Sequence, residues 1–319
     1  MTLLGLLCLL RGSDGLRVSV AHVDHGLRPT SAAEAELVTS LAAQLDAPMW
    51  HRRLQLDRGP ALPARARQLR QGALIDAAVE ASATWVALGH TQTDQAETVL
   101  LHLTRGAGQR GLSGMPTLTP WPPVRAGRVG HWLRPLLDLS REQTRALATH
   151  LRLPFVDDPT NDDRTAPRTR IRHEVLPQLA EINPAVERAI ATAAEHARRA
   201  DDALEQWARS ELARRIRPGS TVDGADPVER VYDLSNGAAL PQQVRWRLIR
   251  GACQDAGLAS DALSAKTVQG IDAAWMEPGR PRSWDLRPEA RVHIAGGRLW
   301  VARAAASAAP TIDPPKPDG

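Results

Sequence analysis

Two carboxylates near the middle of the first half of the chain have a spacing that could serve chemistry. Asp94 and Glu97 lie three residues apart in the stretch 92–105, whose pattern predicts a helix, so both side chains should share one helical face. Two acids on one face suit an ammonium group, such as a lysine or an amine substrate. If Thr91 caps this helix, Asp94 also stabilises its first turn, whereas Glu97 lies beyond that turn and has no such structural explanation.

A second set of candidate residues lies at the ends of two predicted strands. It comprises His22, Asp24 and His25 at the end of the strand at 17–24, and Gly89 and His90 at the end of the strand at 84–89. Ligands of open α/β sheets bind at the carboxyl ends of strands, so these residues are candidates for binding a nucleotide. A structural turn is the alternative at 22–25. A metal site is less favoured because no third ligand lies nearby, and we assign no metal ligand.

Arginine supplies almost all of the positive charge, since lysine occurs only at Lys266 and Lys316. The formal net charge is +4 and the isoelectric point is about 9.8. A GC-rich genome would explain so much arginine, but arginine forks also suit phosphates and bases. The run that contains Arg168 and Arg172 is either a solvated charge run or a contact for phosphate or nucleic acid, and its alternation predicts that Ile171 is buried.

Several classes of protein are excluded or disfavoured. Two cysteines are too few for a disulfide scaffold or a cysteine-ligated metal site, which fits a reduced, cytoplasmic protein. No apolar run is long enough to span a membrane, and the Leu-rich stretch 2–10 predicts a helix buried against a sheet rather than a signal peptide. The run Gly106-x-Gly108-x-x-Gly111 has the spelling of a dinucleotide fingerprint but follows a predicted helix, so we interpret it as a hinge or lid, or as a helix cap and loop.

Alternating strands and helices must position these candidates. Strands at 17–24, 48–56 and 84–89 alternate with helices at 31–45, 63–83 and 92–105. The alternation predicts an α/β fold with a doubly wound, mainly parallel sheet, followed by a smaller helical α+β domain. We expect a catalytic domain at 1–180, a connecting helix at 181–217, a second domain at 218–303 that ends in a Gly296-Gly297 hairpin, and a disordered tail at 304–319.

The motifs taken together resemble the tRNA(Ile)-lysidine synthetase family of PP-loop ATP pyrophosphatases. They occur in the family's order over about the first 180 residues. The similar pieces are His22-Val23-Asp24-His25-Gly26-Leu27-Arg28, Ala66-Arg67-x-x-Arg70, Leu88-Gly89-His90, Asp94-Gln95-Ala96-Glu97-Thr98, Arg105-Gly106-x-Gly108-x-x-Gly111-Leu112-x-Gly114-Met115, Arg134-Pro135-Leu136, Asp158-Pro159-x-Asn161 and Arg168-x-x-Ile171-Arg172. Each piece is weak, but the series is specific. The later helices and the hairpin resemble that family's substrate-binding domain.

The resemblance implies an adenine nucleotide hydrolase-like fold and an ATP-dependent ligation. The wobble cytidine of an isoleucine tRNA is adenylated at carbon 2 of its base with release of pyrophosphate, and the ε-amine of free lysine then displaces AMP. The implied cofactors are ATP and Mg²⁺. The implied partners are tRNA(Ile) with a CAU anticodon and free lysine, with a homodimer as a candidate assembly.

Residue roles follow from the same resemblance. The catalytic candidates are Asp94 and Glu97, which would bind the incoming lysine, and Arg168 and Arg172, which would face phosphates or RNA. The nucleotide pocket would be lined by His22, Asp24, His25, Gly89 and His90. The substrate RNA would be contacted by Arg67, Arg70, Arg105 and Arg110.

The sequence also departs from the family's pattern. The family's Ser-Gly-Gly-x-Asp-Ser loop, which holds pyrophosphate, is missing, and Met1-Thr2-Leu3-Leu4 resembles the residues that follow it. We therefore expect that the chain starts one strand and loop too late, through a misassigned start codon or a real truncation. Thr93 replaces an acid, which weakens any metal role there, Thr169 replaces an asparagine and Gln71 an aromatic residue.

Two other functions stay open. One is a truncated, inactive remnant that binds tRNA, and the other is a different PP-loop enzyme that modifies tRNA, such as a thiolase. The absence of a Cys-x-x-Cys pair counts against the cysteine-dependent thiolases.

Overall fold

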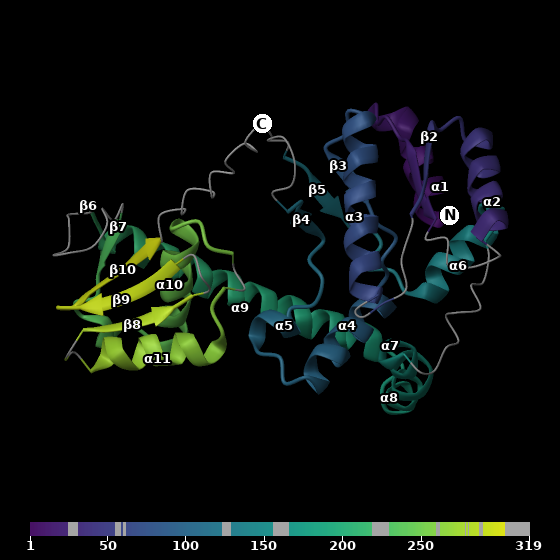
Figure 1. The fold of residues 1–319 in the computed structure, drawn as a ribbon. Coiled ribbons are helices and arrows are strands. Elements are labelled where there is room, and N and C mark those ends of the chain that lie inside the picture. The colour runs from purple at the N-terminus through teal and green to yellow at the C-terminus, as the bar shows by residue number, and fades with distance from the viewer. Residues whose placement is uncertain are drawn as a thin grey trace, which may run out of the picture. The chain divides into compact units, whose positions relative to one another are not determined.

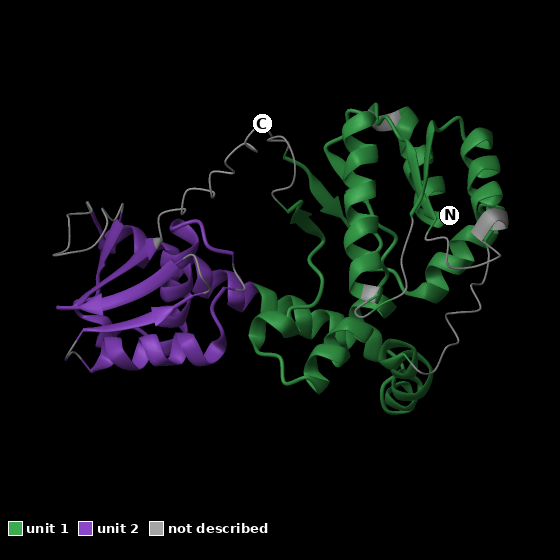
Figure 2. Cartoon of the chain, in the orientation of Figure 1, with its two compact units in different colours: residues 1–198 green, residues 199–319 purple. Residues whose placement is uncertain are grey.

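The chain divides into two compact units, residues 1–198 and residues 199–319 (Figure 2). The computed structural model describes residues 1–24, 31–54, 59, 62–122, 129–155, 166–218, 230–259, 262–277, 279, 281–286 and 290–303. The border between the units falls inside the stretch 181–217, where we expect a connecting helix, and the tail expected at 304–319 lies outside the described residues. No described helix is both long and apolar enough to cross a membrane.

Unit 1 alternates helices and strands, as the sequence predicts (Figure 1). Its elements in chain order are α1 (Thr2–Asp14), β1 (Val20–Asp24), α2 (Ser31–Gln44), β2 (Met49–Arg53), α3 (Leu62–Glu80), β3 (Trp85–Ala87), α4 (Gln92–Thr104), α5 (Gln109–Leu112), β4 (Leu118–Pro120), β5 (His131–Leu133), α6 (Arg141–His150), α7 (Pro167–Arg170), the π-helical turn η2 (Ile171–Val175), α8 (Leu176–Ile182) and the start of α9 (Val186–Arg215).

The described strands of unit 1 form two sheets. β1 pairs in parallel with β2, while β3 pairs in parallel with β5, which also pairs antiparallel with β4. The expected α/β class with mainly parallel pairing is confirmed, but in the described part of unit 1 no strand pairing joins the two sheets. Instead, α3 packs against both, because Leu74 and Ile75 share one apolar cluster with Val23 of β1 and Val86 of β3.

Two stretches of unit 1 differ from the sequence-based expectation. The apolar helix α1 is only partly buried: it packs against α6, where Thr2 Oγ1 donates to the carbonyl of Thr144 at 2.9 Å, and Leu9 stays 65% exposed. The glycine- and proline-rich stretch after α4 is more than a loop, because it contains the short helix α5 and the strand β4. At these two places, apolar composition did not predict how far the helix is buried, and glycine content did not predict the short helix and strand.

Unit 2 is built on an antiparallel sheet covered by two helices. Its elements in chain order are the end of α9, then β6 (Ile216–Pro218), β7 (Arg230–Asp233), the 3₁₀ turn η3 (Gly237–Ala239), α10 (Gln242–Asp255), α11 (Ala265–Met276), β8 (Arg282–Asp285), β9 (Ala290–Ala295) and β10 (Arg298–Arg303). The strand order is β6-β7-β10-β9-β8. Gly296 and Gly297 join β9 to β10 with φ of 55° and 70°, as the predicted two-residue hairpin requires.

A buried ion pair lies inside the core of unit 2. Arg245 of α10 donates through Nε to Asp272 Oδ1 of α11 at 2.6 Å and through NH2 to Asp272 Oδ2 at 3.0 Å. Trp246 Nε1 also donates to Asp272 Oδ2 at 3.1 Å, and Arg245 NH1 donates to the carbonyl of Leu240 at 2.7 Å. The pair joins the two helices of unit 2 with most of its polar atoms satisfied.

Removing one member of this pair should destabilise unit 2 strongly. We expect Asp272→Ala to lower the free energy of unfolding by about 3–5 kcal/mol, because Arg245 is left as an uncompensated buried charge. The matched control is Asp285→Ala, which removes an aspartate from the exposed pair with Arg291 and should change the free energy by less than about 1 kcal/mol. Urea unfolding of both variants measures the difference, and equal losses would contradict the prediction.

Candidate functional site

The site begins at the N-terminus of α4, directly after β3. Thr91 is the N-cap of the helix, and the carboxylate of Asp94 accepts hydrogen bonds at Oδ2 from Thr91 N and Thr91 Oγ1, each at 2.9 Å. The capping role expected for Asp94 is therefore confirmed. Because the cap uses one carboxylate oxygen, Oδ1 faces away from the cap and is available to other partners.

Glu97 lies on the same face and is completely buried, with 0% of its surface exposed. Its Oε2 accepts from Arg168 Nε at 2.6 Å and its Oε1 accepts from Arg172 Nε at 2.5 Å. Asp94 Oδ1 accepts from Arg168 NH2 at 3.0 Å and lies 3.7 Å from Arg172 NH2. These four residues, called here the acid–arginine cluster, balance two negative charges with two positive ones, which is what permits burial of the carboxylate.

Both arginines lie on the helical stretch formed by α7 and η2, which packs against α4. Arg168 and Arg172 are four residues apart and share a helical face. Ile171 is 7% exposed and packs in one apolar cluster with Ala96 of α4 and Leu176. The predicted burial of Ile171 is confirmed, although the stretch is helical rather than extended, and Thr169 is buried as well.

The surroundings keep Asp94 ionised. Burial by itself would raise the pKa of the Asp94 carboxyl, but hydrogen bonds from Thr91 and the charge of Arg168 outweigh burial and hold the pKa below its usual value. Asp94 is therefore a carboxylate at neutral pH.

His90 lies beside the cluster and is neutral. Burial is the largest cause that lowers its pKa to about 4, and the charges of Arg134, Arg168 and Arg67 act in the same direction, while Asp94 opposes them. The Nδ1 atom of His90 is buried and has no hydrogen-bond partner within the described part of the chain. An uncharged imidazole with an unused nitrogen, in a cationic neighbourhood, fits contact with an anionic or polar ligand.

His22 forms a second group at the end of β1. Its ring stacks on that of His51 in β2, with centroids 5.5 Å apart, and Asp24 Oδ2 lies 3.6 Å from Arg53 Nε. Burial and then the charge of His51 lower the pKa of His22, and Arg70 of α3 lowers it further. Arg70 thus acts electrostatically on the end of β1.

The structure brings together most, but not all, of the predicted site residues. His90, Asp94, Glu97, Arg168 and Arg172 meet at the end of β3 and the start of α4, with Arg67 close enough to affect His90. His22, Asp24 and Arg70 gather at the end of β1. Gly89 is exposed, and His25 lies outside the described residues.

Arg105 and Arg110 do not join either group. Both are exposed, and Arg105 caps the C-terminal end of α4, about 16 Å along the helix from Asp94 at 1.5 Å per residue. Any contact of these two arginines with RNA would therefore be separate from the acid–arginine cluster.

Four residues that were not predicted as site residues, His102, Arg134, Gln95 and Arg198, hold the glycine-rich stretch after α4. His102 Nδ1 lies 2.7 Å from the carbonyl oxygen of Gly111, and Arg134 NH1 donates to that of Pro116 at 2.8 Å. Gln95 and Arg198 bind the backbone of Met115. Arg134 and Gln95 belong to the motif pieces that resemble the family, and this is the sequence signal that could have marked them.

Thr93, which replaces an acid of the family's pattern, is buried between three helices. It donates from Oγ1 to Glu187 Oε2 of α9 at 2.7 Å and accepts from the backbone N of Arg141, the first residue of α6, at 3.1 Å. Within the described ranges, no three or more His, Cys, Asp or Glu residues are grouped so that they could hold a metal ion.

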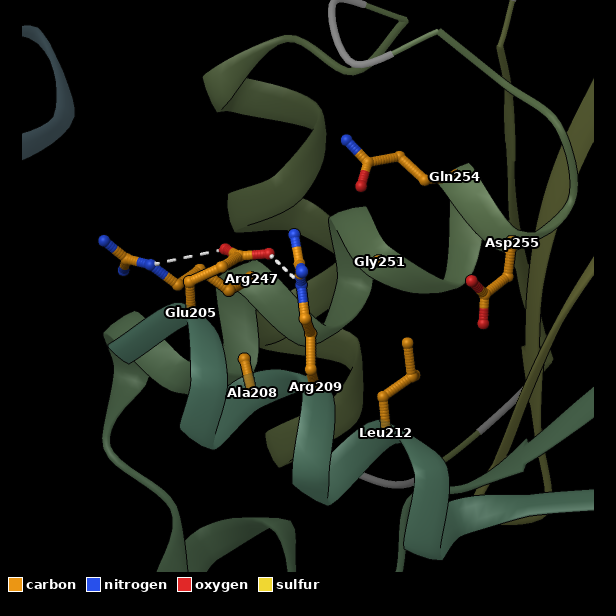
Figure 3. Close-up of a pocket in the computed structure, with 8 residues that line it drawn as sticks. All are labelled: Glu205, Ala208, Arg209, Leu212, Arg247, Gly251, Gln254 and Asp255. Atoms are coloured by element: carbon orange, nitrogen blue, oxygen red, sulfur yellow. Dashed lines mark hydrogen bonds and ion pairs between the residues drawn. The ribbon is translucent and has the colours of Figure 1, made fainter. Parts of the chain in front are cut away.

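Unit 2 has a cavity of its own, of about 350 Å³, between α9 and α10 (Figure 3). Ala208, Leu212 and Gly251 line its apolar part, and Glu205 lies between the guanidinium groups of Arg209 and Arg247, with Nε to carboxylate distances of 3.1 and 3.9 Å. None of the residues predicted from the sequence lines this cavity.

Known proteins are similar to this chain over both of its units. Residues 1–179 match a family model described as a PP-loop domain. The tRNA(Ile)-lysidine synthase of Streptomyces coelicolor is 37% identical over 292 residues, which cover 90% of this chain and 77% of that protein. Those of Thermobifida fusca and Bradyrhizobium diazoefficiens are 34% and 37% identical, and the matches cover 89% and 92% of this chain and 80% and 82% of those proteins.

A solved structure is similar to part of the chain. The U34-tRNA thiolase NcsA from Methanococcus maripaludis has 14% sequence identity and a TM-score of 0.48, over 61% of this chain and 68% of that one.

The low pKa of His90 gives a pH-dependent test. The folded protein should bind a proton at His90 only near pH 4, whereas an unfolded histidine titrates near about 6.5, so the unfolded state binds more protons in between. Stability from this residue is therefore complete above pH 6.5 and is lost as the pH falls toward 4. We expect an NMR titration of His90 with a midpoint near 4, and a smaller loss of stability over this range in His90→Asn. A midpoint near 6.5 would contradict the burial and charge effects.

Proposed function

The chain belongs to the PP-loop family of tRNA(Ile)-lysidine synthases, and on this premise we propose that it joins lysine to the wobble cytidine of tRNA(Ile) in a reaction that uses ATP. The observation that carries the proposal is the meeting of a neutral histidine, several arginines and two acids at the carboxyl end of β3, where α/β sheets bind ligands. The proposal is also supported by relatives of that name, whose alignments cover about nine tenths of this chain.

The first half of the reaction needs groups that receive the phosphates of ATP. His22 and Asp24 at the end of β1, and Gly89 and His90 at the end of β3, are proposed to line the nucleotide pocket. Positive charge is available there, because the charge of Arg70 lowers the pKa of His22 and that of Arg67 lowers the pKa of His90. Developing negative charge on the transferred adenylyl group would be stabilised by these arginines without a change in protonation of the neutral His90.

Magnesium is expected to accompany ATP in such a reaction. The described residues provide no grouped set of carboxylates and histidines that fits a metal ion. We therefore assign no magnesium ligand and derive no step through the ion.

The second half of the reaction needs a site for lysine. Asp94 and Glu97 are proposed to attract its ammonium group, but both carboxylates already face guanidinium groups. An entering ammonium would exchange with one of them, and Arg168 is the better candidate to move, because its side chain is 39% exposed whereas that of Arg172 is 16% exposed. The ε-ammonium first loses one proton to water. The resulting ε-amine forms a bond to carbon 2 of the base as the bond from carbon 2 to the AMP oxygen breaks, and AMP leaves with the electron pair of that bond.

The arginines of the cluster have a second proposed role. Their described bonds to Glu97 use Nε, and those to Asp94 use NH2. A guanidinium group has five N–H donors, and the NH1 group of each arginine points in a different direction from the Nε and NH2 groups that bind the acids. Arg168 and Arg172 are thus proposed to face the phosphate of the adenylated base, while exposed Arg67, Arg70, Arg105 and Arg110 contact the tRNA backbone.

A direct assay tests the ligase. The DNA upstream of Met1 is read in frame, and any strand and Ser-Gly-Gly-x-Asp-Ser loop that it encodes is included in the protein. With ATP, radiolabelled lysine and a tRNA(Ile) transcript that carries CAU, we expect lysine to enter the tRNA with release of AMP. Changing the anticodon should abolish incorporation. Binding of tRNA without AMP release, or transfer of sulfur instead of lysine, would contradict the ligase and favour one of the other two functions.

The role of Glu97 in lysine binding gives a second test. We expect Glu97→Gln to raise the KM for lysine at least tenfold and to leave the KM for ATP within twofold, because the charge that attracts the ammonium is lost. The variant should also lose about 3 kcal/mol of stability, because Arg168 and Arg172, which are both partly buried, then share one carboxylate instead of two. Kinetics are therefore measured well below its unfolding midpoint.

The control for this variant is Glu174→Gln, which removes the same charge from an exposed pair with Arg170 in the neighbouring turn. It should change neither KM. An unchanged KM for lysine in Glu97→Gln, with a raised KM for ATP or tRNA, would mean that Glu97 only orients the two arginines.

A further inference from the structure

Arg134, the residue directly after β5, is a buried arginine with unused donors. It is 9% exposed, and its NH1 donates to the carbonyl of Pro116 at 2.8 Å and to Thr119 Oγ1 at 3.0 Å. Its Nε is buried and has no hydrogen-bond partner, while NH2 keeps contact with solvent and donates to no described residue. A buried donor without a partner is uncommon in folded proteins and calls for an explanation.

The other buried arginine of the described residues shows what the Nε–NH2 edge of a guanidinium can hold. Arg245 in unit 2 donates from Nε and NH2 to the two carboxylate oxygens of Asp272. Arg134 has the same edge but forms no ion pair within the described part of the chain. Because this planar edge matches two oxygens of a carboxylate or a phosphate, it fits an oxyanion that comes from outside the described residues.

Arg134 lies at the edge of the sheet where β3 and β5 both end. The two strands are parallel, and the amide of Leu88 donates to the carbonyl of Leu133 at 2.8 Å, so His90 and Arg134 follow neighbouring strands at the same edge. The charge of Arg134 contributes to the low pKa of His90, which places the two side chains within electrostatic reach. Ligands of α/β sheets bind at this edge.

The charges around Arg134 also favour an anion. Burial is the largest cause that lowers the pKa of its guanidinium, and the charges of Arg67 and Arg198 lower it further. Among the described residues, no acid acts on Arg134 in the opposite direction. Arg67, Arg134 and Arg198 therefore create a local excess of positive charge, which an oxyanion would compensate.

We propose that Arg134 binds a phosphate group of ATP through NH2 and Nε, at the edge of the sheet beside His90. The phosphate enters at NH2, which keeps contact with solvent, and completes the fork at Nε as neighbouring side chains shift. The identity of the phosphate rests on the proposed function, which brings ATP to the end of β3. A small nucleotide suits such a buried arginine better than the backbone of a folded tRNA, whose phosphates are held by exposed arginines.

Three variants of the protein used in the ligase assay test this role. Arg134→Gln removes the charge, and Arg134→Lys keeps the charge without the planar fork. Thr119→Val is the matched control, because it removes one bond to NH1 and leaves Nε and NH2 unchanged. Calorimetry gives the Kd of each variant for ATP and for tRNA, and ¹⁵N NMR follows the Arg134 Nε–H signal as ATP is added.

We expect Arg134→Gln to raise the Kd for ATP by about tenfold or more, because charge-assisted hydrogen bonds to a phosphate are lost, and to leave the Kd for tRNA within about twofold. Arg134→Lys should have a Kd for ATP between those of Arg134→Gln and the unmodified protein, and Thr119→Val should match the unmodified protein. ATP should shift the Arg134 Nε–H signal of the unmodified protein, a measurement that does not depend on the folding of any variant.

Other results would overturn the role of Arg134. If Arg134 only supports Pro116 and Thr119, ATP leaves its Nε–H signal in place, and Thr119→Val weakens ATP binding as much as Arg134→Gln does. If the arginine instead binds a phosphate of the tRNA backbone, Arg134→Gln raises the Kd for tRNA and leaves that for ATP unchanged.

The two proposals fail in different ways. If ATP shifts the Nε–H signal and Arg134→Gln weakens ATP binding, but lysine causes no release of AMP, the ligase function fails and the phosphate contact of Arg134 stands. If the unmodified protein releases AMP with lysine and Arg134→Gln keeps the Kd for ATP, only the role of Arg134 is overturned. A protein that binds no ATP would contradict both.

Discussion

The full burial of one carboxylate, that of Glu97, is the constraint on which the site of unit 1 depends. A buried, ionised glutamate requires compensation by charge and by hydrogen bonds, and Arg168 and Arg172 supply both, one to each oxygen. These arginines lie on α7 and η2. The need to balance the charge of Glu97 on α4 therefore determines where α7 and η2 pack. The apolar contact of Ile171 with Ala96 adds packing to the same junction. A charge requirement thus joins residues that are more than seventy positions apart.

The same arrangement sets the chemistry of its surroundings. Burial, together with the charges of Arg134, Arg168 and Arg67, lowers the pKa of His90 and keeps its imidazole neutral, whereas Asp94 stays ionised because its helix cap and Arg168 favour the charged form. The end of β3 therefore presents fixed negative charge, fixed positive charge and a neutral ring with an unused nitrogen within one small region. Such fixed groups suit the proposed ligation, in which an anionic nucleotide and a cationic amino acid must meet at one base.

The stretch after α5 is positioned by a different kind of bond. Residues 113–116 have no regular structure of their own, and side chains of Gln95, Arg134 and Arg198 bind their backbone carbonyls and the Met115 amide. Backbone groups that are withdrawn from water need partners, and here three helices or strand ends provide them. The stretch that looked like a hinge or lid in the sequence is therefore held at several points. Unit 2, in contrast, is stabilised by its own apolar core and by the buried pair of Arg245 and Asp272.

The sequence by itself determined the local features: the alternation of strands and helices, the cap at Thr91, the shared face of Asp94 and Glu97, the burial of Ile171 and the Gly296-Gly297 hairpin. Each of these depends on residues within a few positions of one another, which is why spacing and propensity predict them. Only the tertiary structure decided that the two acids face Arg168 and Arg172, that His90 is neutral, and that Gln95 and Arg198 hold residues 113–116. Charge compensation and burial are set by residues distant in the chain, and no local pattern shows which distant partner a side chain will meet.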